Sequence, residues 1–240
     1  MARIVLGSAS PRRRELLAAA GVEFEIDKPD VDESLPAGIE PVAAARLLAE
    51  RKARAIVERR AGEPAASADE ERVDERAAER DCVVLAADTI VAVEHDGALH
   101  LLGKPEDERD AARMLAWISG TRHLVVTGVC ALSTRAGARP ELGHERTWVT
   151  LRTITAEEAA AYVASGEWRD KAGGYAIQET ADRFVARLEE GGVDNVVGLP
   201  VALALELLAR AGALVPGTIG GYPSRPFEPD SDRPDEAREP

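Results

Sequence analysis

The sequence has few cysteines and few aromatic residues, and it lacks any long apolar run. Its two cysteines, Cys82 and Cys130, each lie in an apolar stretch typical of a strand, which indicates two buried, reduced thiols and no disulfide. No apolar run approaches the roughly 18 residues of a membrane span, and the N-terminal stretch is too short for a signal peptide. We therefore expect no membrane partner and a cytoplasmic location.

Several common catalytic motifs are also missing. The chain has no Walker A motif, no G-x-G-x-x-G, no H-E-x-x-H and no G-x-S-x-G. The four histidines show no metal-ligand spacing, so each is expected to be structural or exposed: His95, His100, His123 and His144.

The charge is strongly acidic, with a formal net charge of −13 from 43 acidic and 30 basic residues. Because phosphate backbones favour basic surfaces, this balance argues against a nucleic-acid partner, although one cationic pocket can still bind a small phosphorylated ligand. Much of the acid lies at 63–81 and 228–239. We predict one domain over 1–214 with a charged, partly disordered insert at 62–81, followed by a disordered, acidic, proline-rich tail over 215–240.

Strands and helices alternate early in the chain, and strands cluster later. Apolar runs predict strands at 3–7, 24–26, 82–87, 90–93, 99–102, 123–132 and 147–153, and 184–188 is expected to be a short extended piece. Periodicity, prolines and capping residues predict helices at 11–20, 41–60, 106–118, 156–165 and 201–211. The helix at 156–165 begins with a capping box at Thr155, and Asp96-Gly97 predicts a tight turn. Segments 175–178 and 195–198 are expected to be extended, and Gly137 and Gly143 to lie in a loop. This order predicts an α/β fold with a mixed β-sheet flanked by helices.

The segment after the first strand is a candidate anion site. Ser8 and the helix start at Ser10-Pro11 present free backbone N–H groups and the positive end of a helix dipole. Arg12 and Arg13 lie in the first helical turn, where cations are disfavoured unless an anion compensates them. The two arginines therefore suggest a phosphate clamp. The alternative is a pair of surface arginines that bridge to acids elsewhere.

A second candidate is Asp88, which follows the buried strand 82–87 and precedes Thr89. A carboxylate at the end of a strand lies at the sheet edge, where α/β enzymes place active sites. It can hold Mg²⁺ or take a proton from an attacking water. The alternative is an aspartate that only caps the turn.

Two lysines and a pair of carboxylates complete the set. Lys104 lies in a loop stiffened by the proline after it, while Lys52 lies on the apolar stripe of the helix 41–60. A lysine there is unusual, and its simplest interpretation is a side chain that snorkels to solvent. Asp32 and Glu33 add paired carboxylates in a loop.

Taken in order, these segments resemble the Maf family of nucleotide pyrophosphatases. The resemblance runs from residue 4 to about 211 and leaves out the insert and the tail. The matching segments are Leu6-Gly7-Ser8-Ala9-Ser10-Pro11-Arg12-Arg13-Arg14-Glu15-Leu16-Leu17, Val31-Asp32-Glu33, Leu48-Ala49-Glu50-Arg51-Lys52-Ala53, Ala87-Asp88-Thr89-Ile90-Val91, Gly103-Lys104-Pro105, Met114-Leu115, Ser119-Gly120, Asp170-Lys171-Ala172-Gly173-Gly174-Tyr175-Ala176-Ile177-Gln178 and Asn195-Val196-Val197-Gly198-Leu199-Pro200.

The resemblance implies a fold of the Maf/ITPase-like kind, with two lobes and an active-site cleft between them. It also implies hydrolysis of a nucleoside triphosphate to the monophosphate and pyrophosphate, a divalent metal (Mg²⁺, Mn²⁺ or Co²⁺), and a homodimer, since related proteins tend to pair. By position, Asp88 would accept a proton from the attacking water, and Glu33 and Asp88 would place the metal. The triphosphate would be neutralised by Arg12, Arg13, Lys52 and Lys104, with a further contact from the hydroxyl of Ser8.

The residues Arg12, Thr89 and Gln178 resemble the branch of the family that prefers dTTP and UTP. The sequence departs from that branch at Ala176 and Glu179, where glycine is usual on either side of the Ile-Gln pair. Two alternatives remain open: a house-cleaning hydrolase of modified nucleotides, which would use the same residues, and a non-catalytic regulator of septum formation.

Overall fold

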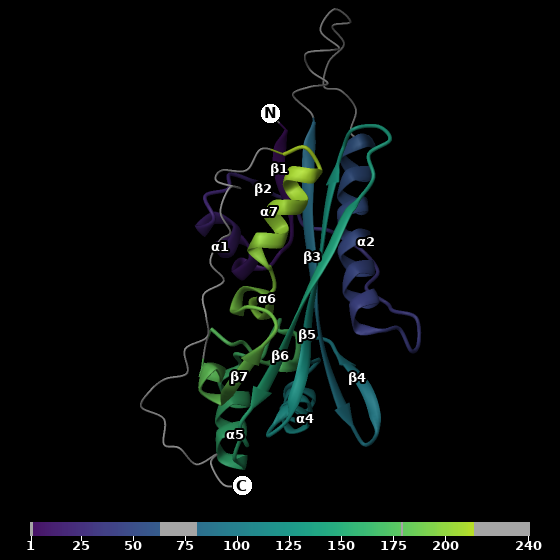
Figure 1. Ribbon diagram of the computed structural model, residues 1–240. Coiled ribbons are helices and arrows are strands. Elements are labelled where there is room, and N and C mark those ends of the chain that lie inside the picture. Colours follow the sequence, from purple (N-terminus) through teal and green to yellow (C-terminus); the bar gives the residue numbers. More distant parts are fainter. Residues whose placement is uncertain (1, 63–80, 179, 214–240) are drawn as a thin grey trace, which may run out of the picture.

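The computed structural model describes residues 2–62, 81–178 and 180–213. They form a mixed seven-stranded sheet in the order β2-β1-β3-β5-β6-β7, with β4 paired to β3 (Figure 1). The strands β2, β1 and β3 are parallel to one another, and the remaining pairs are antiparallel. The strands are β1 (Arg3–Gly7), β2 (Glu25–Ile26), β3 (Cys82–His95), β4 (Ala98–Leu102), β5 (Arg122–Ser133), β6 (Glu141–Leu151) and β7 (Val185–Glu189).

Helices cover this sheet at both ends, which makes an elongated molecule with two lobes (Figure 1). The long strands β3, β5 and β6 run through both lobes. One lobe carries α1 (Pro11–Ala19), α2 (Pro41–Gly62) and α7 (Val201–Arg210). The other carries α4 (Glu108–Ile118), α5 (Ala156–Ser165) and the β4 hairpin, and α6 (Val193–Val197) lies between α7 and β7 in the view. The predicted mixed sheet flanked by helices is confirmed.

In the first lobe, the side chains of β3 alternate between two cores. Val83, Leu85 and Ala87 pack with α1 and α7 on one face, whereas Val84 and Ala86 pack with α2 on the other. This alternation follows from the two-residue period of a strand. It explains why 82–87 is a continuous apolar run, because both of its faces are buried.

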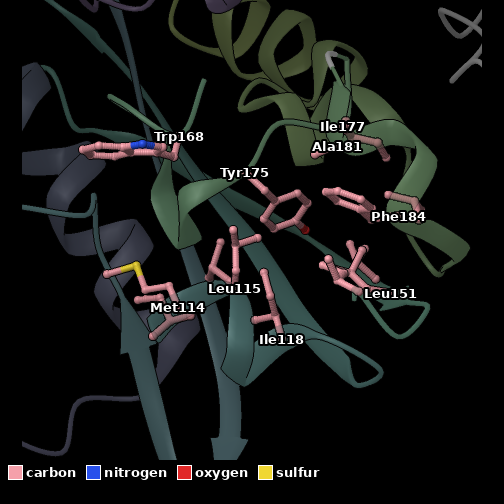
Figure 2. Close-up of a cluster of buried hydrophobic side chains, with 14 of the residues drawn as sticks. Met114, Leu115, Ile118, Leu151, Trp168, Tyr175, Ile177, Ala181 and Phe184 are labelled. Atoms are coloured by element: carbon pink, nitrogen blue, oxygen red, sulfur yellow. The ribbon is translucent and has the colours of Figure 1, made fainter. Parts of the chain in front are cut away.

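The core of the second lobe is richer in aromatic side chains. Figure 2 shows the ring of Tyr175 among Leu115, Ile118 and Phe184. The hydroxyl of Tyr175 forms a hydrogen bond of 2.7 Å with Nε2 of His123, a fully buried residue of β5. This bond ties the segment that follows the 3-10 turn Ala172–Gly174 to the central sheet.

Most predicted elements are confirmed, including the cap of α1 by Ser10 and the capping box at Thr155. The expectation of two buried, reduced cysteines also agrees with the structure, because Cys82 and Cys130 are both buried and free. Nearly all of the insert (63–80) and the tail from 214 onward lie outside the described residues. None of the helices in the described part of the chain combines the length and the apolarity that crossing a membrane requires.

Four local predictions are wrong. Segment 175–178 is not wholly extended, because Ile177 and Gln178 lie in a turn. The strand containing Asp88 does not end there, because β3 continues through it and pairs with β5 along ten consecutive residues. Segment 195–198 is not extended, since Val193–Val197 forms the helix α6. Gly143 lies within β6 and not in a loop, and its missing side chain makes room for Leu203 of α7, only 2.8 Å from where a Cβ would be.

Candidate active site

The sheet has a gap along one edge of β3. The pairing of β3 with β1 ends at Gly7 opposite Ala86, and the pairing with β4 begins only at Val91 opposite Leu102. In the described part of the chain, residues 87–90 of β3 therefore have no strand partner on this side. Asp88 and Thr89 lie in this gap. The sheet edge expected for Asp88 is present, but in the middle of a strand, where pairing with β5 on the other side holds the backbone rigid.

A cleft of about 870 Å³ opens over this gap. Its volume is in the range of pockets that bury small-molecule ligands. All nine predicted site residues line it: Ser8, Arg12, Arg13, Glu33, Lys52, Asp88, Thr89, Lys104 and Gln178. They come from both lobes and from segments far apart in the sequence.

Lys52 links two carboxylates at the floor of the cleft. Its Nζ lies 2.7 Å from Oε1 of Glu33 and also forms a short ion pair with Oδ1 of Asp88. The side chains of Lys52 and Asp88 are only 10% and 11% exposed, whereas that of Glu33 is 51% exposed. The predicted snorkelling of Lys52 to solvent is therefore wrong, because this lysine is buried and its charge is paired.

The loop that carries Glu33 is fastened to α2. Asp32 accepts hydrogen bonds from the backbone N–H and the hydroxyl of Ser34, and Arg51 donates to the carbonyls of Asp32 and Ser34. Burial raises the pKa of Glu33, but the hydrogen bond and charge of Lys52, helped by the nearby charge of Lys104, outweigh it. The net pKa is below the usual value, so Glu33 is ionised at neutral pH.

A glycine on β5 sets how closely α2 approaches the sheet. Gly128 pairs with Asp88, and a Cβ at Gly128 would lie 2.4 Å from the backbone carbonyl of Ala45 and 2.6 Å from the amide nitrogen of Arg46. The backbone of α2 thus rests directly on Gly128. Lys52 lies two helical turns after Ala45, on the stripe that faces the sheet, and so it reaches Asp88.

Arg13 joins three segments at the other side of the gap. Its Nε donates to the carbonyl of Gly198 at 2.7 Å, its Nη1 to the carbonyl of Ala87 at 2.7 Å, and its Nη2 to the hydroxyl of Thr89 at 3.0 Å. The carbonyl of Ala87 belongs to the unpaired edge of β3, so Arg13 supplies the donor that a neighbouring strand would have given. Burial lowers the pKa of Arg13, and the charge of Asp88 opposes this effect.

The start of α1 forms the adjoining wall. Ser10 caps the helix by accepting from the backbone N–H of Arg13, and the buried hydroxyl of Ser8 accepts from the N–H of Ser10. Arg12 lines the cleft, and its side chain has no hydrogen-bond partner among the residues that the structure describes. Of the two arginines, Arg12 is the one whose donors are available to a ligand.

The second lobe supplies the opposite wall. Lys104 follows β4 and is exposed, and the carbonyl of Gly103 accepts from the N–H of Gly173 at 2.9 Å. That bond ties the lysine loop to the segment that leads to Gln178, another exposed residue of the cleft.

Two further cations of the cleft, Arg169 and Lys171, were not among the predicted site residues, although Lys171 belongs to one of the matching segments. With them, six cationic side chains and three carboxylates line the cleft of a chain whose net charge is −13. The cleft is therefore a cationic site in an acidic molecule, which suits a polyanionic ligand.

The carboxylates could also hold a divalent metal. Glu33 and Asp88 both reach the same lysine nitrogen, so their oxygens converge on one place. No cluster of three or more candidate metal-ligating residues occurs within 2–62, 81–178 and 180–213. Two carboxylates fit Mg²⁺, which is commonly bound by one or two carboxylates together with substrate phosphates.

Comparisons with known proteins give a consistent result. The relatives include proteins named dTTP/UTP pyrophosphatase from Moorella thermoacetica, 43% identical over 91% of this chain and 100% of the relative, and from Anaeromyxobacter sp., 43% identical over 93% and 96%. A third, from Pelotomaculum thermopropionicum, is 38% identical over 88% and 98%.

Among solved structures, a nucleoside-triphosphatase / dITP/XTP pyrophosphatase from Mycobacterium abscessus covers 64% of this chain and 76% of its own, at 15% identity and a TM-score of 0.34. A likeness at that score supports no argument about the cleft. A family model described as Maf-like protein matches residues 3–211. With this match and with relatives of about 40% identity that align over almost their whole length, the chain belongs to the Maf family.

Proposed function

We propose that this protein is a nucleoside triphosphate pyrophosphatase that hydrolyses dTTP and UTP to the monophosphate and pyrophosphate. The observation that carries the proposal is the convergence of all nine predicted site residues on one cationic cleft between the lobes. The names of the relatives, which match this chain over 88–93% of its length, support the same reaction and the same substrates.

The triphosphate needs several positive charges, and the two lobes offer them from opposite walls. In this proposal the side chain and the backbone N–H of Arg12, in the first turn of α1, bind phosphate oxygens on one wall. Lys104 binds on the other wall. Arg13 contributes its charge, while its hydrogen bonds to the carbonyls of Ala87 and Gly198 mainly hold the cleft together. Fixed charges of this kind stabilise the charge that spreads over the phosphoryl oxygens during transfer.

Asp88 is the proposed acceptor of the proton from the attacking water. It lies on a strand paired along its length with β5, so its position is fixed to within the motion of the sheet. Lys52 holds Oδ1 of Asp88 and leaves its other carboxylate oxygen outside that ion pair. A general base must lie within hydrogen-bond reach of the proton it accepts, and Asp88 lines the cleft in which the water would lie.

Glu33 and Asp88 are the proposed ligands of a divalent cation. When bound, Mg²⁺ would supply neutralisation of the phosphate charge and polarisation of the phosphoryl oxygen. Because Lys52 already pairs with both carboxylates, we expect little metal binding by the protein alone and tighter binding together with a nucleotide. Titration of Mn²⁺, with and without a non-hydrolysable UTP analogue, measures this difference. Equal affinity in the two titrations would contradict it.

The proposed reaction is tested with a panel of nucleoside triphosphates in the presence of Mg²⁺, Mn²⁺ or Co²⁺. We expect dTTP and UTP to give monophosphate and pyrophosphate, and EDTA to abolish the release. Faster turnover of methylated or deaminated nucleotides would replace the substrate assignment with that of a house-cleaning hydrolase. No hydrolysis of any nucleotide by the folded protein would remove the enzymatic proposal and favour a regulator of septum formation.

The cytoplasmic location is an expectation drawn from the cysteines and the apolar pattern of the sequence, and the homodimer is one drawn from the family resemblance. Sedimentation equilibrium of the full chain measures the second directly. A mass of twice 25.6 kDa would support the homodimer, and a monomer at all concentrations would exclude it.

A further inference from the structure

A chain of hydrogen bonds runs from the cleft into the core of the sheet. The hydroxyl of Thr89 lies 3.0 Å from the hydroxyl of Thr127 on β5, and Oγ1 of Thr127 lies 2.9 Å from the backbone carbonyl of Asn195 on α6. Thr127 and Asn195 are fully buried, whereas Thr89 lines the cleft. The amide of Asn195 is itself held, because its Nδ2 donates to the carbonyl of Val125 and to the hydroxyl of Thr147.

The backbone carbonyl of Asn195, at the end of this series of hydrogen bonds, determines which group donates in each of them. A carbonyl oxygen cannot donate, so the only hydrogen of the Thr127 hydroxyl goes to the carbonyl of Asn195. Thr127 must then accept from Thr89, which uses the only hydrogen of the Thr89 hydroxyl. Arg13 donates to one lone pair of Thr89. What Thr89 has left for a ligand is one lone pair and no hydrogen.

The surroundings of Thr89 suit a nucleobase better than a phosphate. Its side chain points to the same face of β3 as Val91, because the two residues are two apart on a strand. On that face the cleft is lined by apolar side chains of the second core: Val91, Val125, Ile177, Val196 and Val197. Gly198 keeps the space beside the hydroxyl free, since a Cβ there would lie 3.2 Å from Oγ1 of Thr89.

We propose that Thr127 is a specificity-determining positioning residue, which makes the Thr89 hydroxyl an obligate acceptor for a ring N–H of the substrate base. The inference rests on the proposed function and deepens it. Thymine and uracil carry a hydrogen on N3, so they can donate to Thr89. Cytosine has a lone pair on N3, which faces the lone pair of Thr89 with no hydrogen between them. The buried threonine thus selects imide bases without touching the substrate.

The native protein provides the first test, which depends on no variant. We compare kcat/KM for UTP, CTP and N3-methyluridine triphosphate by pyrophosphate release. Losing a matched hydrogen bond and leaving its partner unpaired changes binding at least about tenfold. We therefore expect UTP to exceed both CTP and the N3-methyl substrate by ~10-fold or more, mainly through KM. Equal values for UTP and CTP would overturn the inference.

The second test changes the direction of the bond. Thr127→Val keeps the shape of the side chain but removes the acceptor for Thr89, so the hydrogen of Thr89 becomes free to reach N3 of cytosine. The ratio of UTP to CTP turnover is then expected to fall about tenfold, toward one. Thr127→Ser is the matched control, because it retains the hydroxyl and with it the native ratio.

A third variant covers the case in which Thr127→Val does not fold. Thr89→Val alters a partly exposed residue, removes the acceptor itself, and is expected to lower the same ratio by raising KM for UTP. An unchanged ratio in the folded Thr127→Val protein, or in Thr89→Val, would overturn the inference while leaving the proposed function intact. No hydrolysis of any nucleotide by the native protein would remove the proposed function first, and the inference with it.

Discussion

The ion pair between Lys52 and Asp88 is the part of the cleft whose removal has the most calculable effect. Both side chains are about nine-tenths buried, so neither charge is well solvated without the other. Lys52→Met leaves the Asp88 carboxylate without its cation. Removing one partner of a buried pair costs about 3–5 kcal/mol, and because the cleft admits some water we expect ~3 kcal/mol of unfolding free energy.

Replacing Asp88 instead of Lys52 is expected to lower the unfolding free energy by less. In Asp88→Asn, Lys52 keeps its contact with Glu33, so the loss in unfolding free energy is ~1–2 kcal/mol. In the double variant only Glu33 loses its cation, and its side chain is 51% exposed to solvent; the loss in unfolding free energy is therefore ~2 kcal/mol. The two changes are therefore not additive, and the coupling free energy is ~2 kcal/mol or more.

The assay is urea unfolding of the native protein, the two single variants and the double variant at pH 7.5 without metal. Tryptophan fluorescence monitors the unfolding. The exposed pair Glu206–Arg210 on α7 is the matched control, for which a cycle is expected to give only ~0.3–0.5 kcal/mol. Additivity of Lys52→Met and Asp88→Asn to within ~0.5 kcal/mol would refute the reasoning, because the pair would then behave like a surface contact.

Three further predictions follow from other parts of the fold. Gly128→Ala forces its methyl group against the backbone of Ala45, which is expected to cost ~1–3 kcal/mol of unfolding free energy and to reduce turnover by moving Lys52; native stability and activity in this variant would contradict the close approach. Burial lowers the pKa of His123 to about 3. As the pH falls through 6.5, this histidine therefore binds a proton in the unfolded chain but not in the folded protein. The free energy of unfolding of the native protein should then fall by ~2 kcal/mol between pH 7 and pH 5. Urea unfolding of His123→Gln at pH 7 and pH 5 should not show this fall in unfolding free energy. The same fall in the variant as in the native protein would exclude a buried neutral histidine. Burial raises the pKa of Cys130 to about 12, and Cys82 is shielded by its burial, so neither thiol should react with Ellman's reagent at pH 8 until urea is added.

Most of the fold could be predicted because its signals are local. The cap of α1 at Ser10, the turn at Asp96-Gly97 and the capping box at Thr155 each depend on residues within one turn of chain. The apolar runs of the sequence predict the strands of the core. The prediction for 195–198 failed because it depends on partners far away in the sequence. This valine-rich segment suggested extended chain, but part of it belongs to the helix α6. There the side-chain amide of Asn195 donates hydrogen bonds to Val125 and Thr147, which lie on two strands of the sheet.

The candidate site could be predicted as a set of residues but not as an arrangement. Lys52 was noticeable because a charge interrupts an apolar stripe, yet its partner Asp88 lies 36 residues later, and only the register of α2 on Gly128 brings them together. Arg13 was identified as a phosphate ligand, but two of its acceptors are backbone carbonyls 74 and 185 residues away. No sequence pattern marks which carbonyl of a sheet edge lacks a strand partner. Thr127 gave no signal at all, since a threonine in a buried strand is ordinary.

One measurement tests the central claim, that this cleft hydrolyses nucleoside triphosphates between the α- and β-phosphates. The products of UTP are identified for the native protein, for Asp88→Asn, and for Glu157→Gln, which removes an exposed carboxylate on α5 away from the cleft. We predict UMP and pyrophosphate from the native protein and from Glu157→Gln, and at least ~100-fold slower release from folded Asp88→Asn, the loss expected on removing a general base. Release of UDP and phosphate, or an Asp88→Asn protein as active as the native one, would contradict the account.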